Sequence, residues 1–212
     1  MRRFDYLKRL ATLIPDTTLA VCNLQDTTYE WQHLRPSDGN LLRQGMGCVS
    51  STAFGVARAL PKQKVIALDG DGSMLLGLGM LTTLGRYAPP NLIVFIFDNA
   101  CYFSTTRAFS PGGVQPTATA FGTDLEAMAR GAAVKNAITV ADMKAFEEAV
   151  NTSLKSGEMW LIVVKVDDHL PEKVPMPTID GKENKYRFLR FVEKIEGRNI
   201  LPTEEEKSFR TS

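Results

Sequence analysis

Cysteine is scarce in this sequence. Its 212 residues include only three, Cys22, Cys48 and Cys101, and no two of them have C-x-x-C spacing. An odd number of scattered cysteines argues against a disulfide framework and against a cysteine-bound metal or iron–sulfur cluster. Histidine is rarer still. His33 and His169 stand alone, without the spacing of metal ligands, so surface or capping roles are expected for both.

Long apolar runs and a strong net charge are also missing. The apolar runs LIVFIF and LIVVKV have the length of a strand and are too short to span a bilayer. The formal net charge of +1 implies neither a nucleic-acid nor a membrane partner. The N-terminal segment MRRFDYLKRL is basic but lacks the continuous apolar core of a secretory signal. The cytoplasm is therefore the expected location.

Strand-like and helix-like patterns alternate along most of the chain. Five or six short, apolar runs are expected to be strands: 18–22, 41–44, 64–68, 91–97, 137–140 and 159–166. Helical spacing is found in the segments 3–14, 26–33, 48–60, 73–86, 124–133, 141–156 and 186–196. The alternation predicts an α/β fold, with a doubly wound, mostly parallel sheet and helices on both faces. We expect one domain over residues 1–178 and a C-terminal arm over 179–212, which either closes over its own domain or docks on a partner.

Two neighbouring strands of the predicted sheet end on polar residues. Asp71 follows the strand that begins at Lys64, in a Gly-Asp-Gly turn, and Asn99 follows the next strand. Ligands bind at the carboxyl ends of the strands in an open α/β sheet, so these side chains should share one site. The glycines allow a ligand to approach the backbone, and the free N–H groups of the next helix suit a phosphate.

The oxygens of Asp71 and Asn99 predict a metal ion beside that phosphate. Mg²⁺ binds few protein oxygens and completes its octahedron with substrate phosphates and water. The turn is neither of the two common nucleotide-binding loops. No Gly-Lys-Ser/Thr follows it, and Leu75 stands where G-x-G-x-x-G has its third glycine.

The run Gly70-Asp71-Gly72-Ser73, with 26 residues between Gly72 and Asn99, resembles the signature of thiamine-diphosphate enzymes. The resemblance covers about residues 5 to 170. It implies the diphosphate-binding type of domain in this family, with thiamine diphosphate and Mg²⁺ as cofactors. The implied metal ligands are Asp71, Asn99 and the backbone carbonyl of Cys101. The other cofactor-binding residues it implies are Asn23, Gln44, Gly45, Met46, Gly70, Gly72, Ser73 and Tyr102.

The segment Gln44-Gly45-Met46 has two interpretations. In thiamine-diphosphate enzymes a similar glycine-rich turn lies against the aminopyrimidine ring, and a bulky apolar side chain props the cofactor into its bent shape. Met46 matches that position, and the carbonyl of Gln44 would face the 4′-amino group. Alternatively, Met46 is an ordinary core residue and the glycines only turn the chain.

The resemblance is strongest to the small diphosphate-binding chains of sulfopyruvate and phosphonopyruvate decarboxylases, in the runs VCNLQDTTYE, LRQGMGCVSS and DGDGSML. Such enzymes release CO₂ from a small anionic 2-oxo acid and give an aldehyde. The alternatives are the β-chain of another thiamine-diphosphate enzyme, namely a 2-oxo-acid oxidoreductase or a carboligase, and a non-catalytic cofactor-binding regulator. Arg107, in the loop 103–119, is the nearest candidate in this chain for binding the anionic group of the substrate, and donors from the partner are an equal alternative.

The resemblance also implies a partner. In this superfamily, a glutamate on a pyrimidine-binding domain promotes activation of the cofactor, and 212 residues hold only one such domain. We therefore expect a separate pyrimidine-binding α subunit, in a hetero-oligomer such as α2β2, with the aromatic part of the arm as a plausible contact. The chain's own glutamates are expected on solvated helix faces: Glu30, Glu126, Glu147, Glu148 and Glu158.

Overall fold

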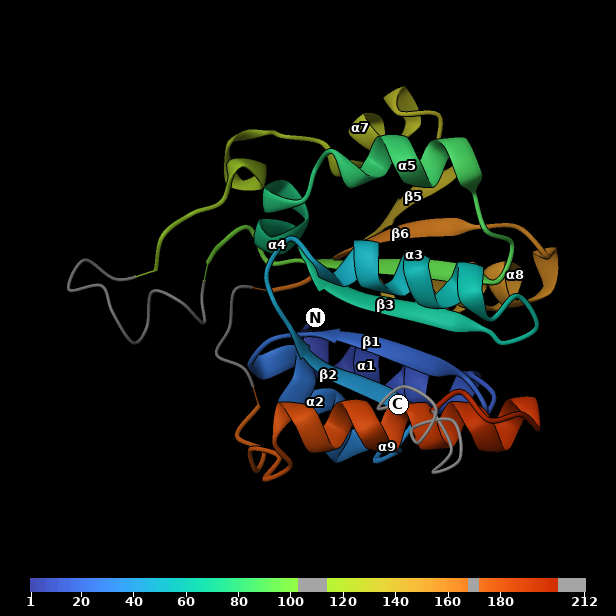
Figure 1. The fold of residues 1–212 in the computed structure, drawn as a ribbon. Coiled ribbons are helices and arrows are strands. Elements are labelled where there is room, and N and C mark those ends of the chain that lie inside the picture. The colour runs from blue at the N-terminus through green and yellow to red at the C-terminus, as the bar shows by residue number, and fades with distance from the viewer. Residues whose placement is uncertain (103–113, 168–171, 202–212) are drawn as a thin grey trace.

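A computed structural model describes residues 1–102, 114–167 and 172–201. Arg107 and His169 lie outside these ranges. Six parallel strands form one sheet in the order β2-β1-β3-β4-β6-β5 (Figure 1). The strands are β1 (Leu19–Asn23), β2 (Asn40–Gln44), β3 (Val65–Gly70), β4 (Leu92–Asp98), β5 (Asn136–Val140) and β6 (Trp160–Lys165). The predicted α/β fold is confirmed, and the sheet is parallel throughout.

Alternate residues of the central strands enter two separate cores. In β3, Val65 and Ala67 face one core, while Ile66 and Leu68 face the other. All four side chains are buried, which explains why the strand is a continuous apolar run rather than an alternating one.

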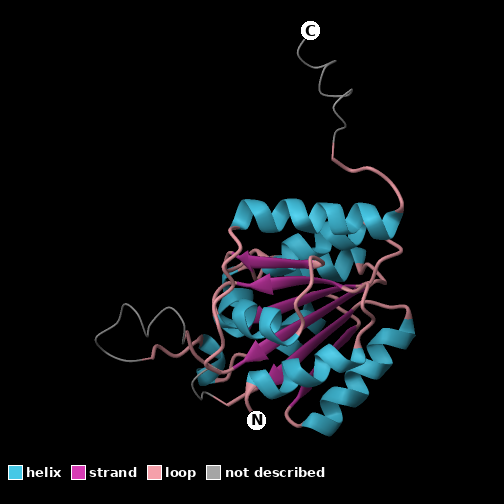
Figure 2. Ribbon diagram, turned by 90° about the horizontal axis from the view of Figure 1, so that it is seen from below, coloured by secondary structure: helices cyan, strands magenta, loops and turns pink. Residues whose placement is uncertain are grey.

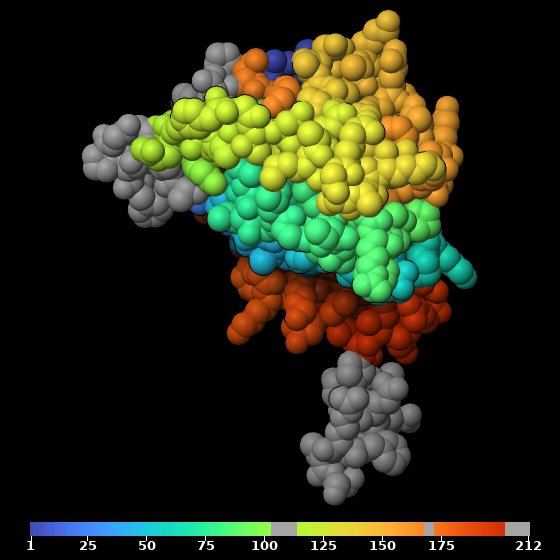
Figure 3. Space-filling model, turned by 90° about the horizontal axis from the view of Figure 1, so that it is seen from above, coloured from blue at the N-terminus to red at the C-terminus, as the bar shows by residue number. Residues whose placement is uncertain are grey.

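Helices cover both faces of the sheet. On one face lie α1 (Arg3–Leu13), α2 (Asp26–Leu34) and α8 (Met143–Ser156). The other face carries α3 (Val49–Ala59), α5 (Met80–Tyr87), α7 (Leu125–Gly131) and α9 (Gly181–Glu196). Figure 3 shows α7, α5, α3 and α9 in that order, as the yellow, green, cyan and orange-red segments. No helix within the described ranges is long and apolar enough to cross a membrane.

The prediction of one helix over 73–86 is wrong. The structure has α4 (Asp71–Leu76) and α5, separated by a turn at residues 77–79. A Cβ atom on Gly77 would lie 2.4 Å from the backbone oxygen of Gly47, so only glycine allows this close approach. The turn therefore brings the 45–47 segment against the end of α4.

The helix in the C-terminal arm begins at residue 181, five residues earlier than predicted. Asp180 caps it by accepting hydrogen bonds from the backbone N–H groups of Lys182 and Glu183. Of the two placements left open for the arm, this helix lies against its own domain, beside β2 (Figures 1 and 2).

The contact between α9 and β2 combines apolar packing with two buried hydrogen bonds. Phe188 and Val192 are buried in the core under α9. The side chain of Asn184 donates to the carbonyl oxygen of Asn40 at 2.9 Å and accepts from the backbone N–H of Leu42 at 2.8 Å. These bonds satisfy backbone groups on the outer edge of β2, which is where an unpaired strand would otherwise be open to another chain.

Candidate cofactor and metal site

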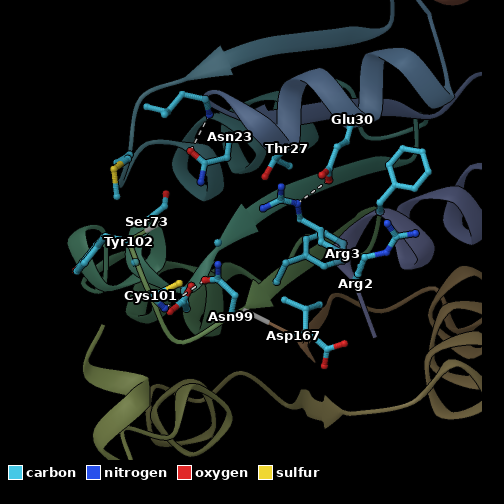
Figure 4. Close-up of a pocket in the computed structure, with 18 of the residues that line it drawn as sticks. Arg2, Arg3, Asn23, Thr27, Glu30, Ser73, Asn99, Cys101, Tyr102 and Asp167 are labelled. Atoms are coloured by element: carbon cyan, nitrogen blue, oxygen red, sulfur yellow. Dashed lines mark hydrogen bonds and ion pairs between the residues drawn. The ribbon is translucent and has the colours of Figure 1, made fainter. Parts of the chain in front are cut away.

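A cavity opens at the carboxyl ends of β1, β3 and β4 (Figure 4). The chain moves from β1 to β2 on one side of β1 and then returns to form β3 on its other side. This edge is therefore a topological switch point, the usual ligand site of such sheets. Nine of the candidate residues line the cavity: Asn23, Met46, Gly70, Asp71, Gly72, Ser73, Asn99, Cys101 and Tyr102. Gln44 and Gly45 do not line it.

Three oxygen-bearing groups converge in this cavity. One terminal atom of the Asn99 side chain lies 3.2 Å from Asp71 Oδ1 and 2.9 Å from the carbonyl oxygen of Cys101. With the amide nitrogen in that position, Asn99 donates a hydrogen bond to both oxygens. With the amide oxygen there, three oxygens face one another, and such a set binds a hard cation. The donor set therefore fits Mg²⁺.

The second oxygen of Asp71 is held by two threonines that sequence reasoning missed. Asp71 Oδ2 accepts a hydrogen bond from Thr117 Oγ1 at 2.5 Å and from Thr119 Oγ1 at 3.1 Å. Thr119 Oγ1 also lies 2.8 Å from Asp98 Oδ1, and Asp98 is buried in an ion pair with Lys165. These contacts fix the carboxylate plane of Asp71 so that Oδ1 faces Asn99.

Burial raises the pKa of Asp71 to about 6. The hydrogen bond from Thr117 opposes the rise, and the charge of Asp98 adds to it. Because burial disfavours the charged form, a bound cation would favour it by supplying the missing counter-charge.

Tyr102 packs directly over the Gly-Asp-Gly turn. A Cβ atom on Gly72 would lie 2.4 Å from Tyr102 Cε1 and 3.2 Å from Thr117 Cγ2. Only glycine therefore fits at position 72. The same turn is joined to the 45–47 segment, since the backbone N–H of Gly47 donates to Ser73 Oγ at 3.1 Å.

Asp69, the other carboxylate of the β3 end, does not line the cavity. It is buried and accepts hydrogen bonds from Ser50 Oγ at 3.3 Å and from the backbone N–H of Gly70 at 2.9 Å. Burial raises the pKa of Asp69 to about 6. Its position below the turn makes it a structural support of the site.

The expectation that Glu30 lies on a solvated helix face is wrong. Its side chain is 1% exposed and lines the cavity. Glu30 Oε2 accepts from Arg3 Nε at 2.8 Å, and Oε1 accepts from the backbone N–H of Glu172 at 3.2 Å. The sequence did not indicate the burial of Glu30, because its ion-pair partner Arg3 is 27 residues away. The other glutamates considered are exposed or half-buried and do not line this cavity: Glu126, Glu147, Glu148 and Glu158.

Among the described residues, Asp71 is the one carboxylate of the cavity lining that forms no ion pair. Glu30 pairs with Arg3, Glu172 with Arg2, and Asp167 with the N-terminal amine. The carboxylate without an ion-pair partner thus coincides with the converging oxygens.

Comparison with known proteins agrees with this geometry. Residues 27–164 match the family described as "Thiamine pyrophosphate enzyme, C-terminal TPP binding domain". The chain belongs to this family of thiamine pyrophosphate enzymes. The matched region contains the Gly-Asp-Gly turn, Asn99 and both threonines, whereas Arg3 and Asn23 precede it.

Several named proteins are similar over most of this chain. The "Sulfopyruvate decarboxylase subunit beta" of Methanocaldococcus jannaschii is 31% identical over 91% of this chain and 98% of its own length. Its counterpart from Methanococcus maripaludis is 31% identical over 92% and 99%. The "Phosphonopyruvate decarboxylase" of Streptomyces viridochromogenes is 28% identical over 90% of this chain but only 46% of its own length. These relatives are decarboxylases by name, and the chain has the size of the beta subunits.

Proposed function

We propose that this chain is the diphosphate-binding subunit of a two-chain decarboxylase that uses thiamine diphosphate and Mg²⁺. The substrate would be a small 2-oxo acid with an anionic group, sulfopyruvate or phosphonopyruvate, which loses CO₂ to give an aldehyde. The observation that carries this proposal is the cluster of Asp71, Asn99 and Cys101 oxygens at the switch point of the sheet. The names of the relatives support the substrate class.

The chain's residues divide into two groups for this role. When bound, thiamine diphosphate supplies the carbon nucleophile and the electron sink that decarboxylation of a 2-oxo acid needs. Asp71, Asn99 and the Cys101 carbonyl would hold the metal. The diphosphate would lie against the other lining candidates: Asn23, Gly70, Gly72, Ser73 and Tyr102. The pyrimidine would meet the Gln44–Met46 turn, which Ser73 holds in place through Gly47.

The activating glutamate would come from a separate α subunit. Glu30 is the one glutamate among the candidates that reaches the cavity, and both of its carboxylate oxygens already accept hydrogen bonds. A carboxylate fixed in this way is a poor candidate for contact with the cofactor's pyrimidine. An α2β2 assembly is the simplest arrangement that pairs each diphosphate site with a pyrimidine site.

Sulfopyruvate is the favoured substrate of the two. The relatives named for it as beta subunits are matched over nearly their whole length, whereas the phosphonopyruvate decarboxylase is about twice as long as the matched region. Arg107 stays a candidate for binding the anionic group of the substrate, and it lies outside the described residues.

The test is reconstitution with the α subunit, identified by co-purification. The complex, with Mg²⁺ and thiamine diphosphate, should release CO₂ from sulfopyruvate faster than from phosphonopyruvate or pyruvate. Asp71→Ala in the same complex should abolish cofactor binding in calorimetry, because the diphosphate would lose its counter-ion. This chain alone should bind the cofactor weakly and release no CO₂.

Two outcomes would contradict the proposal. Decarboxylation by this chain alone at the rate of the complex would refute the split site. CO₂ release that required coenzyme A and an electron acceptor would identify a 2-oxo-acid oxidoreductase instead.

A further inference from the structure

The side chain of Arg3 reaches into the cavity from the first turn of α1. Figure 4 shows its guanidinium in the middle of the site, between Thr27 and Asn99. The side chain is only 18% exposed, and its Nε donates to Glu30 at 2.8 Å. Among the described residues, its Nη1 and Nη2 atoms form no hydrogen bond or ion pair. Two charged donors therefore remain available for a ligand.

Arg2 provides a contrast within the same cavity lining. Its Nε and Nη2 donate to Asp5, and its Nη1 donates to Glu172. All three of its nitrogens are thus engaged at the protein surface. Of these two arginines, Arg3 is the one with donors to offer.

Glu30 fixes the orientation of those donors. It is fully buried and accepts from Arg3 through a single oxygen, so the planar guanidinium is held by one edge. The free edge carries parallel N–H groups, a geometry that suits two oxygens of a phosphate or sulfonate. A fixed guanidinium also loses less side-chain entropy when it binds such a group.

We propose that Arg3 is an anion-binding residue of the cofactor site, and that its free N–H groups bind the terminal phosphate of thiamine diphosphate. Glu30 is then its positioning residue. The inference rests on the proposed function. The phosphate is favoured over the sulfonate of a substrate because the diphosphate is the part of the cofactor that must lie beside the metal, and the Arg3 guanidinium lies between Thr27 and Asn99, one of the proposed metal ligands. Arg3 precedes the residues matched to the family, so this contribution is specific to the N-terminal segment of the chain.

The test is calorimetric titration of the assembled complex, in Mg²⁺, with thiamine diphosphate and with thiamine monophosphate, which lacks the terminal phosphate. The double variant Arg3→Gln/Glu30→Gln removes both charges together, so that no unpaired charge is left buried. Its Kd for thiamine diphosphate should rise roughly tenfold to hundredfold, the range for loss of a charge-assisted hydrogen bond. Its Kd for thiamine monophosphate should change less than about threefold.

Two further variants serve as a control and as an independent test. Arg2→Gln is the matched control, since it removes a cavity-lining arginine whose donors are engaged, and it should leave both affinities unchanged. Arg3→Lys keeps the charge and the pairing with Glu30 but lacks the parallel N–H groups of the free guanidinium edge. It should fold normally and weaken diphosphate binding by roughly threefold to tenfold, and it decides the matter if the double variant fails to assemble.

Several results would overturn the inference. Unchanged diphosphate affinity in Arg3→Lys would remove Arg3 from the site, as would equal losses for the two thiamine phosphates. Unchanged affinity for thiamine diphosphate together with a raised KM for sulfopyruvate would show that Arg3 binds the substrate instead. If the wild-type complex binds no thiamine diphosphate, the proposed function itself fails.

Discussion

Replacement of Gly72 by alanine tests how closely Tyr102 covers the Gly-Asp-Gly turn. The new Cβ atom would lie 2.4 Å and 2.6 Å from Tyr102 Cε1 and Cδ1, so the ring must move by about 1 Å to reach ordinary contact. Overpacking of this kind costs about 1–3 kcal/mol. Replacing glycine by alanine within a helix normally stabilises a protein by up to about 1 kcal/mol. A net loss of stability in Gly72→Ala would therefore have to come from the contact with the ring.

Denaturation with urea measures the free energy of unfolding of the purified chain, and calorimetry on the complex measures the affinity for Mg²⁺ and thiamine diphosphate. Gly72→Ala should lower both the free energy of unfolding and the affinity. Gly70→Ala is the matched control for the stability measurement, because its nearest new neighbour would be Asn23 Nδ2 at 3.5 Å and its φ of −120° is open to any residue. It should cost less than about 0.5 kcal/mol.

A double-mutant cycle assigns the effect to the tyrosine ring. In a Tyr102→Ala background, the destabilisation caused by Gly72→Ala should fall to less than half, with the remainder due to Thr117 Cγ2 at 3.2 Å. If Gly72→Ala costs the same with and without the ring, or if it is as mild as Gly70→Ala, the packing argument is wrong.

Three further predictions concern the fold that supports the site. Between about pH 4 and 6, the raised pKa of Asp69 should make cofactor-free protein lose about 2–3 kcal/mol of stability as the pH rises and the buried carboxyl ionises; Asp69→Asn should make the pH profile shallower in urea titrations and leave the part due to Asp71, whose pKa is also raised to about 6, and an unchanged pH profile would refute the assignment. Asn184→Leu should cost roughly 2–4 kcal/mol, since the two buried hydrogen bonds to the edge of β2 are lost; a smaller effect than that of an exposed asparagine change would show that α9 does not hold that edge. Asp142→Ala, which removes the N-cap of α8, should lower stability by about 1 kcal/mol while leaving cofactor affinity unchanged.

The strands and the converging ends of β3 and β4 could be predicted from the sequence because both depend on local signals. Buried parallel strands are continuous apolar runs, and the carboxyl ends of neighbouring strands meet at one edge. Asp71, Asn99 and Cys101 therefore lie together as expected. Their assignment as metal ligands stays a prediction.

The parts that could not be predicted depend on contacts between distant segments. Thr117 reaches Asp71 across 46 residues, and Arg3 reaches Glu30 across 27. No sequence motif predicts either contact, because the residues around a threonine or an arginine do not indicate which distant residue its side chain will bind. The break between α4 and α5 likewise depends on Gly47, whose backbone packs against Gly77.

The central claim is that Asp71, Asn99 and the Cys101 carbonyl bind the metal that carries the cofactor's diphosphate. A crystal structure of the assembled complex with Mn²⁺ and thiamine diphosphate, with the metal located by its anomalous scattering, tests it most directly. One peak is expected about 2.1 Å from Asp71 Oδ1, Asn99 Oδ1 and the Cys101 oxygen, with the remaining ligands from the diphosphate and water. A metal bound elsewhere, or a diphosphate outside this cavity, would contradict it.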